Sequence, residues 1–307
     1  MTARRPFRFA VQSLQLGDRG SLIDDATTAA RCGYEELYSY DHIGAVDPFV
    51  PLMVAAEASS ALRVGPLVLN NELHHPVLLA RAAATADRLT GGRLILGMGT
   101  GYMQSEHDAA GIELRRPGPR VDRFAESLTI LRALLDSGAA AFEGQHHRVD
   151  LEDLGVRPVQ PRVPFLIGGH GRRVVGLAGQ HADIFQFTGL THAADGTPGP
   201  GGFGIDDVRQ RSRWLHEAAG DRIDDIERSI LVQVTHLGAG SDEKAAEIAA
   251  RFGADRALVD ATPFALVGSV EQVVDKLERL REDIGASHVV VRDVAGFAPV
   301  VEALAGH

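Results

Sequence analysis

The chain has 307 residues, of which 45% are hydrophobic and 23% charged, and this composition is typical of a folded globular protein with a large core. Its formal net charge is −10, which disfavours binding to nucleic acid or to anionic membranes. The single cysteine, Cys32, excludes an intrachain disulfide, and no apolar run approaches the roughly 18 residues that span a bilayer. The first residues lack the apolar segment of a secretory signal, so we expect a cytoplasmic protein.

Eight short apolar segments fit the buried strands of a parallel sheet. In chain order they are residues 7–11, 36–38, 66–69, 94–98, 164–167, 184–187, 230–235 and 288–291. Helical patterns lie between most of them, and the clearest places Val121, Phe124 and Leu128 on one face at spacings of three and four. This alternation favours an α/β fold with one (β/α)₈ TIM barrel domain over residues 1–307, rather than an open doubly wound sheet.

Local signals mark the ends of two predicted helices. Ser269 followed by Gln272 fits a capping box at the start of a helix that continues to residue 284. The pair Gly91-Gly92 is a C-terminal stop for a helix over residues 77–89. In that helix we expect one buried face, made of Leu78, Leu79, Ala82, Ala86 and Leu89.

Two irregular stretches interrupt the repeat. Residues 139–162 contain the turn pattern EGQHHRVD and predict a β-hairpin excursion. Residues 188–204 are rich in glycine and proline, which predicts a flexible loop. This loop is either a lid over an active site or an ordinary surface segment.

Polar side chains follow the second and third predicted strands, at the edge where parallel α/β proteins bind ligands. Asp41 and His42 come after the strand at 36–38, and Asn70 and Asn71 follow the strand at 66–69. The imidazole of His42 can accept or donate a proton near neutral pH, and an adjacent carboxylate can fix its tautomer. The alternative is that His42 makes an ordinary loop hydrogen bond.

Glycines follow the fourth and fifth predicted strands. Gly97, Gly99 and Gly101 are two residues apart, so they leave room on one face for a flat ring or a backbone, unless they serve barrel packing. Residues 168–173, GGHGRR, open a helix and present backbone N–H groups suited to phosphate, or else form a plain strand-to-helix turn. The sequence GMGTGY lacks the spacing of a dinucleotide fingerprint, which disfavours NAD.

Two other clusters carry weaker signals. Glu72, His74 and His75 invite a metal hypothesis, but they lack the spacing of known sites, and the chain has no HExxH or CxxC, so we predict no metal. A metal-dependent barrel hydrolase is accordingly disfavoured. Residues 115–120, RRPGPR, either meet a polyanionic ligand tail or form solvated surface.

Four motifs taken together resemble the bacterial luciferase-like superfamily of flavin and deazaflavin enzymes. They are YSYDHIG, HHPVLLARAAATADRLTGGRLILGMGTGY, PFLIGGHGRRV and FALVGSVEQVVDKL, and they span most of the chain. The GTG after the fourth strand and the DH after the second are most similar to the branch that uses coenzyme F420. The resemblance implies a (β/α)₈ barrel that binds this deazaflavin, and it is compatible with a homodimer.

The resemblance also implies roles for individual residues. Asp41 and His42 would lie beside the deazaflavin ring, and Asn70 and Asn71 would form the third-strand bulge that backs it, often through a non-prolyl cis peptide. The remaining cofactor contacts would come from Thr100, Gly101 and Ser105 after the fourth strand, and from Gly168, Gly169, Gly171 and Arg172 around the phosphate.

One position departs from the family pattern. The sugar-phosphate dehydrogenases of this branch carry a glutamate directly after GTG, whereas this chain has Tyr102, which puts that substrate in doubt. His42 and Tyr102 are therefore the candidate catalytic residues for proton transfer, and Glu106 lies one helical turn further on.

The leading hypothesis is an F420-dependent oxidoreductase that transfers a hydride to or from a small organic substrate, while the cofactor supplies the difficult chemistry. An FMN-dependent monooxygenase that uses oxygen is the first alternative. A non-catalytic flavin or deazaflavin binder is the second. In each case the expected ligands are small molecules, with neither nucleic acid nor a membrane as a partner.

Overall fold

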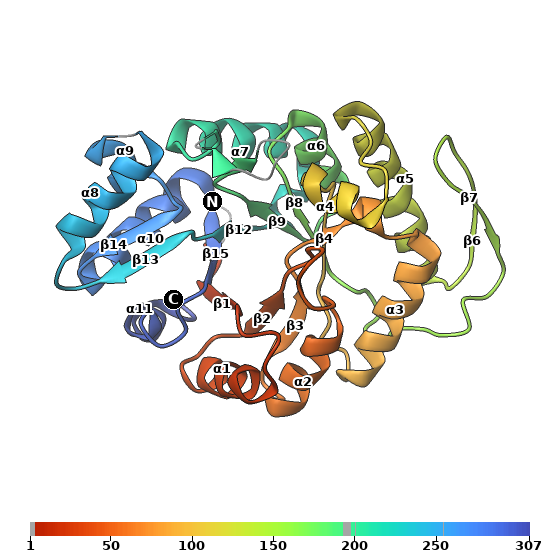
Figure 1. Ribbon diagram of the computed structural model, residues 1–307, viewed down its shortest axis with the longest axis horizontal. Helices are drawn as coiled ribbons and strands as arrows, with labels where there is room; N and C mark the ends of the chain where they lie inside the picture. Colours follow the sequence, from red (N-terminus) through yellow and green to blue (C-terminus); the bar gives the residue numbers. More distant parts are fainter. Residues whose placement is uncertain (1–3, 193–197, 200, 254) are drawn as a thin grey trace.

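The computed structural model describes residues 4–192, 198–199, 201–253 and 255–307, and its centre is a parallel β-barrel (Figure 1). The barrel strands are β1 (Arg8–Gln12), β2 (Glu36–Ser39), β3 (Arg63–Pro66), β4 (Leu69–Asn70), β5 (Leu96–Gly99), β8 (Phe165–Gly168), β9 (Ile184–Phe187), β12 (Glu227–Leu231) and β15 (Ala286–Val291). Their hydrogen-bonded order is β3-β2-β1-β15-β12-β9-β8-β5-β4.

Strands β3 and β4 are two halves of one barrel strand, interrupted at Leu67 and Val68. The first half pairs with β2 and the second half with β5, and a bridge between Val64 and Leu94 completes the ring. When β3 and β4 are counted as one, eight strand positions, called staves below, therefore close the barrel within the described residues. The predicted (β/α)₈ barrel is confirmed.

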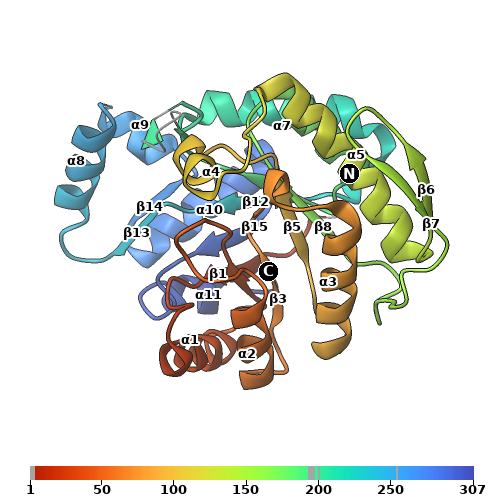
Figure 2. The same ribbon diagram turned by 45° about the vertical axis from the view of Figure 1, so that its right-hand side comes forward.

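Most of the helices surround the barrel on its outer face, whereas α4 lies at the carboxyl ends of the strands (Figures 1 and 2). The helices are α1 (Arg19–Arg31), α2 (Val50–Ala58), η1 (Asn71–Leu73), α3 (Pro76–Leu89), α4 (Gln104–Ala110), α5 (Pro117–Asp136), α6 (Arg172–His181), α7 (Ile205–Ala219), η2 (Gly220–Asp224), α8 (Ser241–Phe252), α9 (Arg256–Ala261), α10 (Val270–Ile284) and α11 (Ala298–Leu304). The predicted capping box is present, because Ser269 accepts from the backbone of Gln272 and the Gln272 side chain accepts from Ser269 in return.

The predicted buried face of α3 is partly wrong. Leu78, Ala82 and Leu89 are exposed, whereas Leu79 and Ala86 are buried as predicted and Ala80 and Ala83 are buried as well. The helix packs against both the barrel and α5, so small alanines face the crowded side and the two leucines turn outward. After the helix, Gly91 and Gly92 have positive φ angles of 69° and 81°, the left-handed stop that the sequence predicts.

Two segments leave the barrel repeat. Strands β6 (Ala140–Glu143) and β7 (Arg148–Leu151) pair antiparallel as a hairpin that extends outward beside α5 in both views (Figures 1 and 2). The predicted lid at 188–204 includes residues 193–197 and 200, which lie outside the described residues. Around them, β10 (Thr191–His192) pairs antiparallel with β11 (Pro198–Gly199).

The predicted strand at 230–235 is divided in two. Strand β12 ends at Leu231, and β13 (Val234–Leu237) then pairs with β14 (Ala265–Gly268) in a separate two-stranded parallel sheet. The backbone N–H groups of Gln233 and Val234 donate to the carbonyl of Phe264, which draws the chain away from the barrel at this point. A segment that is apolar except for Gln233 and Thr235 therefore contains a change of sheet.

A layer of side chains fills the barrel interior, with one member from or next to each stave. These are Ala10, Tyr38, Leu67, Ile95, Leu166, Ile184, Leu231 and Val290. The layer separates the two ends of the barrel, and the two ends differ in chemistry.

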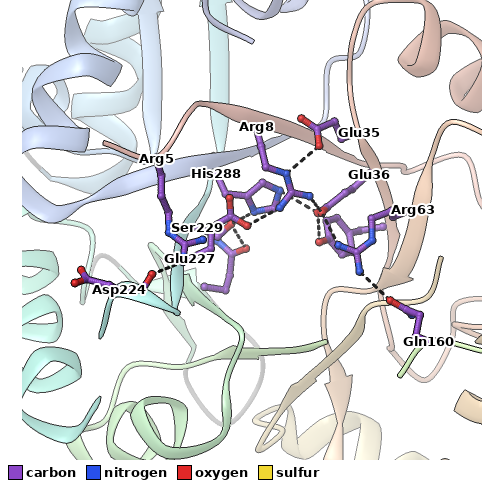
Figure 3. Close-up of polar contacts among 12 residues, drawn as sticks. Arg5, Arg8, Glu35, Glu36, Arg63, Gln160, Asp224, Glu227, Ser229 and His288 are labelled. Carbon is purple, nitrogen blue, oxygen red and sulfur yellow. Dashed lines mark hydrogen bonds and ion pairs between the residues drawn. The ribbon is translucent and has the colours of Figure 1, made fainter. Parts of the chain in front are cut away.

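The N-terminal ends of the strands hold a buried ionic network around Glu36 (Figure 3). Arg8, the first residue of β1, contacts Glu36 and also lies 2.7 Å from Glu227. His288 Nε2 lies 3.0 Å from Glu36 Oε2, and its Nδ1–H donates to Ser229 Oγ at 2.7 Å. Side chains from β1, β2, β12 and β15 thus fasten this end of the barrel together.

Candidate active site

A cavity of about 360 Å³ lies at the carboxyl ends of the strands, across the apolar layer from the ionic network. Its apolar wall includes Leu67, Val68, Leu190 and Leu231, and its polar groups include Gln12, Glu106, Gln233 and Arg292. Among the predicted site residues, those that line the cavity are Asp41, His42, Asn70, Gly101 and Tyr102. The structure therefore brings together the exits of the second, third and fourth staves.

The imidazole of His42 is held by a carboxylate from α4. His42 Nδ1 lies 2.7 Å from Glu106 Oε1, and the backbone N–H of Ile43 donates to Glu106 Oε2 at 3.2 Å. A carboxylate accepts hydrogen bonds only, so Nδ1 carries a proton toward Glu106 and Nε2 is presented to the cavity. The tautomer is therefore fixed by Glu106 rather than by the adjacent Asp41.

Tyr102 lies on the other side of His42. Its hydroxyl is 3.5 Å from His42 Nε2, and the two rings meet edge to face with centroids 5.9 Å apart. Burial, followed by the negative charge of Glu106, raises the pKa of Tyr102 to about 12, although Arg292 opposes the shift. The phenol consequently keeps its proton at neutral pH and can act as a donor in the cavity.

Asp41 anchors the third-stave exit instead of contacting His42. Its Oδ2 accepts from the backbone N–H of Asn70 at 2.9 Å and lies 2.9 Å from His74 Nε2. The Asn70 amide then donates to His107 Nε2 at 2.9 Å, while His107 Nδ1–H donates to the carbonyl of Ile112. This chain of contacts joins β4 to α4, which carries Glu106.

Gly101 is required by the position of Asn70. Its φ is +78°, and a Cβ at this residue would lie 2.0 Å from Asn70 Oδ1. We predict that Gly101→Ala displaces the Asn70 amide and destabilises the protein by more than the roughly 1 kcal/mol expected from φ alone. Urea denaturation measures the effect.

Gly111→Ala is the matched control for that prediction. Gly111 has a similar φ of +65° but nothing within 4 Å of the added Cβ, so only the conformational cost applies. Equal losses of stability in the two variants would show that contact with Asn70 is unimportant.

The third-stave bulge lies earlier than the resemblance implied. A non-prolyl cis peptide joins Leu67 and Val68, not Asn70 and Asn71, and both Leu67 and Val68 line the cavity. A Cβ on Gly97 would lie 2.0 Å from the carbonyl oxygen of Pro66, just before the bulge. Gly97 thus leaves room for the backbone of the neighbouring strand, rather than for a ligand ring.

The predicted phosphate loop lies next to the cavity but does not line it. Gly168, Gly169 and Gly171 are followed by α6, whose first turn receives no side-chain cap. The loop touches the cavity wall through His170, whose Nε2 lies 2.7 Å from Thr188 Oγ1. Arg172 points elsewhere, because its guanidinium pairs with Glu217 at 3.1 Å on the surface.

Three other predicted contacts lie outside the cavity lining. Ser105 is exposed on α4, and Thr100 is half-buried between β5 and the lining residue Gly101. Asn71 is 3% exposed and begins η1, where its carbonyl accepts from Arg123. Its Nδ2 is buried and has no hydrogen-bond partner among the described residues.

Sequence reasoning missed three polar lining residues and gave Glu106 no role. Gln12 and Arg292 stand at the ends of the first and last staves, so the rule that selected Asp41 and His42 also applies to them. Gln233 follows the undetected change of sheet. Glu106 follows Tyr102 by one helical turn, but this spacing does not reveal that its partner is His42.

The described part of the chain has neither a membrane-spanning helix nor a cluster of metal-binding side chains. No helix in it combines the length and apolar character needed to cross a bilayer. Likewise, no three or more of its His, Cys, Asp and Glu side chains are grouped to hold a metal ion.

Comparison of the chain with known proteins identifies a family and several relatives. The luciferase-like monooxygenase family model matches residues 6–235. An F420-dependent glucose-6-phosphate dehydrogenase of Nakamurella multipartita is 30% identical over 193 residues, covering 60% of this chain and 56% of that protein. The chain thus spans about half the length of the first relatives it matches.

A second relative matches over a longer range. The F420-dependent glucose-6-phosphate dehydrogenase of Amycolatopsis mediterranei is 28% identical over 298 residues, covering 93% of this chain and 83% of that protein. Among solved structures, the coenzyme F420 dependent tetrahydromethanopterin reductase from Methanopyrus kandleri superposes with a TM-score of 0.74 and 20% identity, covering 97% of each chain. At that identity the superposition supports the fold alone.

Proposed function

Because the chain belongs to the luciferase-like monooxygenase family, we propose that it is an oxidoreductase that binds coenzyme F420 and transfers a hydride between this deazaflavin and a small organic substrate. The observation that carries the proposal is the cavity, where a carboxylate-held imidazole and a protonated phenol face an apolar wall. The F420-dependent relatives supply the choice of cofactor.

The residues present fit such a cofactor. Leu67, Val68 and Leu231 form an apolar surface on which a flat ring can pack. Beside it, the uncapped N-terminus of α6 presents backbone N–H groups, and the helix dipole favours a phosphate there. Gly171 has open space around its missing Cβ, which lets an anion approach the backbone. When bound, F420 would supply two-electron hydride chemistry.

The protein's own part is to hold and move a proton. His42 Nε2 faces the cavity because Glu106 binds the other ring nitrogen, so a neutral His42 can accept a proton there and return it. Tyr102 keeps its hydroxyl proton and can hold a substrate oxygen beside that nitrogen. The apolar wall restricts water around the reacting groups.

Titration of the purified protein with F420 tests the proposal. We expect saturable binding, followed through the absorbance and fluorescence of the deazaflavin. Binding of FMN in place of F420, with consumption of oxygen, would instead support a monooxygenase. If neither cofactor binds, the proposal is wrong.

A charge change in the loop gives a sharper expectation. Gly171→Asp places a carboxylate at the N-cap of α6, where it stabilises the helix but repels a phosphate. We expect F420 to bind at least about tenfold more weakly, which corresponds to about 1.4 kcal/mol, while thermal stability is maintained.

The neutral control for that variant is Gly171→Ser, which adds a cap without a charge. It should retain most of the F420 affinity. A similar loss in both variants would indicate that the added side-chain bulk matters and that the phosphate binds elsewhere.

A further inference from the structure

Arg292 is a cation in the cavity that has no partner of opposite charge in the described part of the chain. It directly follows β15 and lines the cavity together with Tyr102 and His42. Its Nε donates to Gln12 Oε1 at 2.9 Å, and its Nη1 donates to Gln233 Oε1 at 3.2 Å. Among the described residues, no carboxylate oxygen lies within ion-pair distance of the guanidinium, and Nη2 makes no hydrogen bond.

The two glutamines hold this guanidinium in a fixed direction. Gln12 Nε2 donates to the carbonyl of Leu67 at 2.9 Å, and Gln233 Nε2 donates to the carbonyl of Leu231 at 3.2 Å. Each side-chain oxygen is therefore turned toward Arg292. Both supports are neutral, so they orient the positive charge without cancelling it.

Arg93 shows what a structural arginine looks like in the same fold. It also lacks a carboxylate within the described ranges, but it donates to the four backbone carbonyls of Ala56, Ser59, Leu62 and Thr90 at 2.7–2.9 Å. Its donors are thereby used up in fastening loops. Arg292 instead keeps Nη2 available beside the cavity.

The electrostatics of the cavity favour an incoming anion. Burial lowers the pKa of Arg292, with Tyr102 opposing the shift, because the positive charge is incompletely compensated. The two carboxylates in the lining are already engaged, Glu106 by His42 and Ile43 and Asp41 by His74 and Asn70. The hydrogen bonds of the two carboxylates thus go to other protein groups, whereas Nη2 of Arg292 makes none among the described residues and is left to bind an anion.

The hydrogen-bond donors of Arg292 limit which anion can bind. One guanidinium with one open nitrogen suits a single carboxylate, whereas a phosphate binds better to several cations or to a helix N-terminus. The surrounding wall is apolar and suits a carbon skeleton. The arrangement thus selects an organic acid rather than a sugar phosphate.

We propose that Arg292 binds the carboxylate of the substrate, so that the substrate is a small organic acid held with its body against the apolar wall, beside Tyr102 and His42. This assignment rests on the proposed function, because it presupposes that the protein is an oxidoreductase with an organic substrate. It names Arg292 as a residue that determines specificity, with Gln12 and Gln233 as its positioning residues.

The probes for the test are benzoate, its neutral isostere benzamide, and phenylphosphonate. Their dissociation constants are measured by calorimetry on F420-saturated protein and on cofactor-free protein. We expect benzoate to bind at least tenfold more tightly than benzamide or phenylphosphonate. Equal affinity for benzoate and benzamide, or failure of every probe to bind, overturns the proposal, and tighter phenylphosphonate overturns the choice of a carboxylate.

Three variants test whether Arg292 causes the preference for benzoate. Arg292→Gln should abolish the preference for benzoate, Arg292→Lys should retain part of it, and Arg148→Gln should leave it unchanged. Arg148 has an 81% exposed side chain on the hairpin, so its loss alters net charge by the same amount far from the barrel strands. Should Arg292→Gln fail to fold, the comparison of Arg292→Lys with the wild-type protein still tests the assignment.

F420 binding by the same variants separates the two proposals. Arg292→Gln should bind F420 as the wild-type protein does. If this variant loses F420 affinity and keeps the benzoate preference, the guanidinium serves the cofactor and the substrate assignment is wrong. If the wild-type protein binds no F420 but still prefers benzoate, the proposed function fails while the anion site stands.

Discussion

Replacing His42 by alanine is expected to lower kcat for F420-dependent turnover by about 10²–10⁴-fold, because we propose that Nε2 accepts and returns the proton in the cavity. F420 affinity should change little, since the proposed phosphate contacts come from the loop before α6. The measurement is single-turnover absorbance of the deazaflavin with a carboxylic acid substrate found by screening.

Two neighbouring substitutions refine that result. Tyr102→Phe removes a donor but leaves His42 in place, so we expect a smaller loss of kcat than in His42→Ala. Glu106→Gln leaves His42 without the carboxylate that fixes its tautomer, and kcat should again fall. Normal F420 binding with unchanged turnover in His42→Ala would remove the catalytic role and favour another proton donor.

Replacing Glu36 by glutamine is expected to destabilise the protein by about 3 kcal/mol, because removing one member of a buried ion pair leaves its partners uncompensated. Glu36 has no exposed surface and contacts the Tyr38 hydroxyl. It also contacts Arg8 and His288, which lie around it in Figure 3. Urea denaturation at pH 6 measures the loss.

Glu35→Gln is the control for this effect. Glu35 binds the same Arg8 at 2.9 Å, but its side chain is 49% exposed, so its removal should cost less than about 1 kcal/mol. A similar loss in both variants would mean that burial of the network contributes nothing beyond a surface pair.

The network also predicts a pH dependence of stability. Burial alone would raise the pKa of Glu36, but His288 and Arg8 lower it well below the usual range, so its contribution is present above about pH 4.5 and is lost on acidification. Burial opposes protonation of His288, but Glu36 raises its pKa, so that contribution is complete below about pH 6.5 and is lost as the pH rises. The network therefore stabilises the protein most between these two pH values. In Glu36→Gln, the free energy of unfolding should vary less with pH on both sides of this range.

Most of the barrel could be predicted from the sequence because its strands are short, continuously apolar and separated by helical periodicity. The break within the third stave and the departure of β13 could not be predicted, since Leu67, Val68 and Val234 are as apolar as their neighbours. Both depend on hydrogen bonds with distant segments, such as the one from Val234 to Phe264. A local pattern does not contain that information.

The candidate site was predictable to the extent that residues immediately follow strands. Asp41, His42 and Tyr102 line the cavity for this reason, as do the overlooked Gln12 and Arg292. The pairing of His42 with Glu106 was not predictable, because it depends on how α4 packs over the barrel opening through Asn70 and His107. Asp41 was the closer carboxylate in sequence, yet its side chain turns toward His74.

We expect the two ends of the barrel strands to differ in their tolerance of substitutions. Ionic contacts made by Arg8, Glu36 and His288 secure one end of the barrel, whereas the residues that line the cavity lie at the other, with a layer of apolar side chains between them. A mutant library confined to positions such as Leu14, Leu190 and Gln233 would leave the ionic fastening intact. We therefore expect substitutions at these three positions to change the cavity lining while the ionic network keeps its contacts.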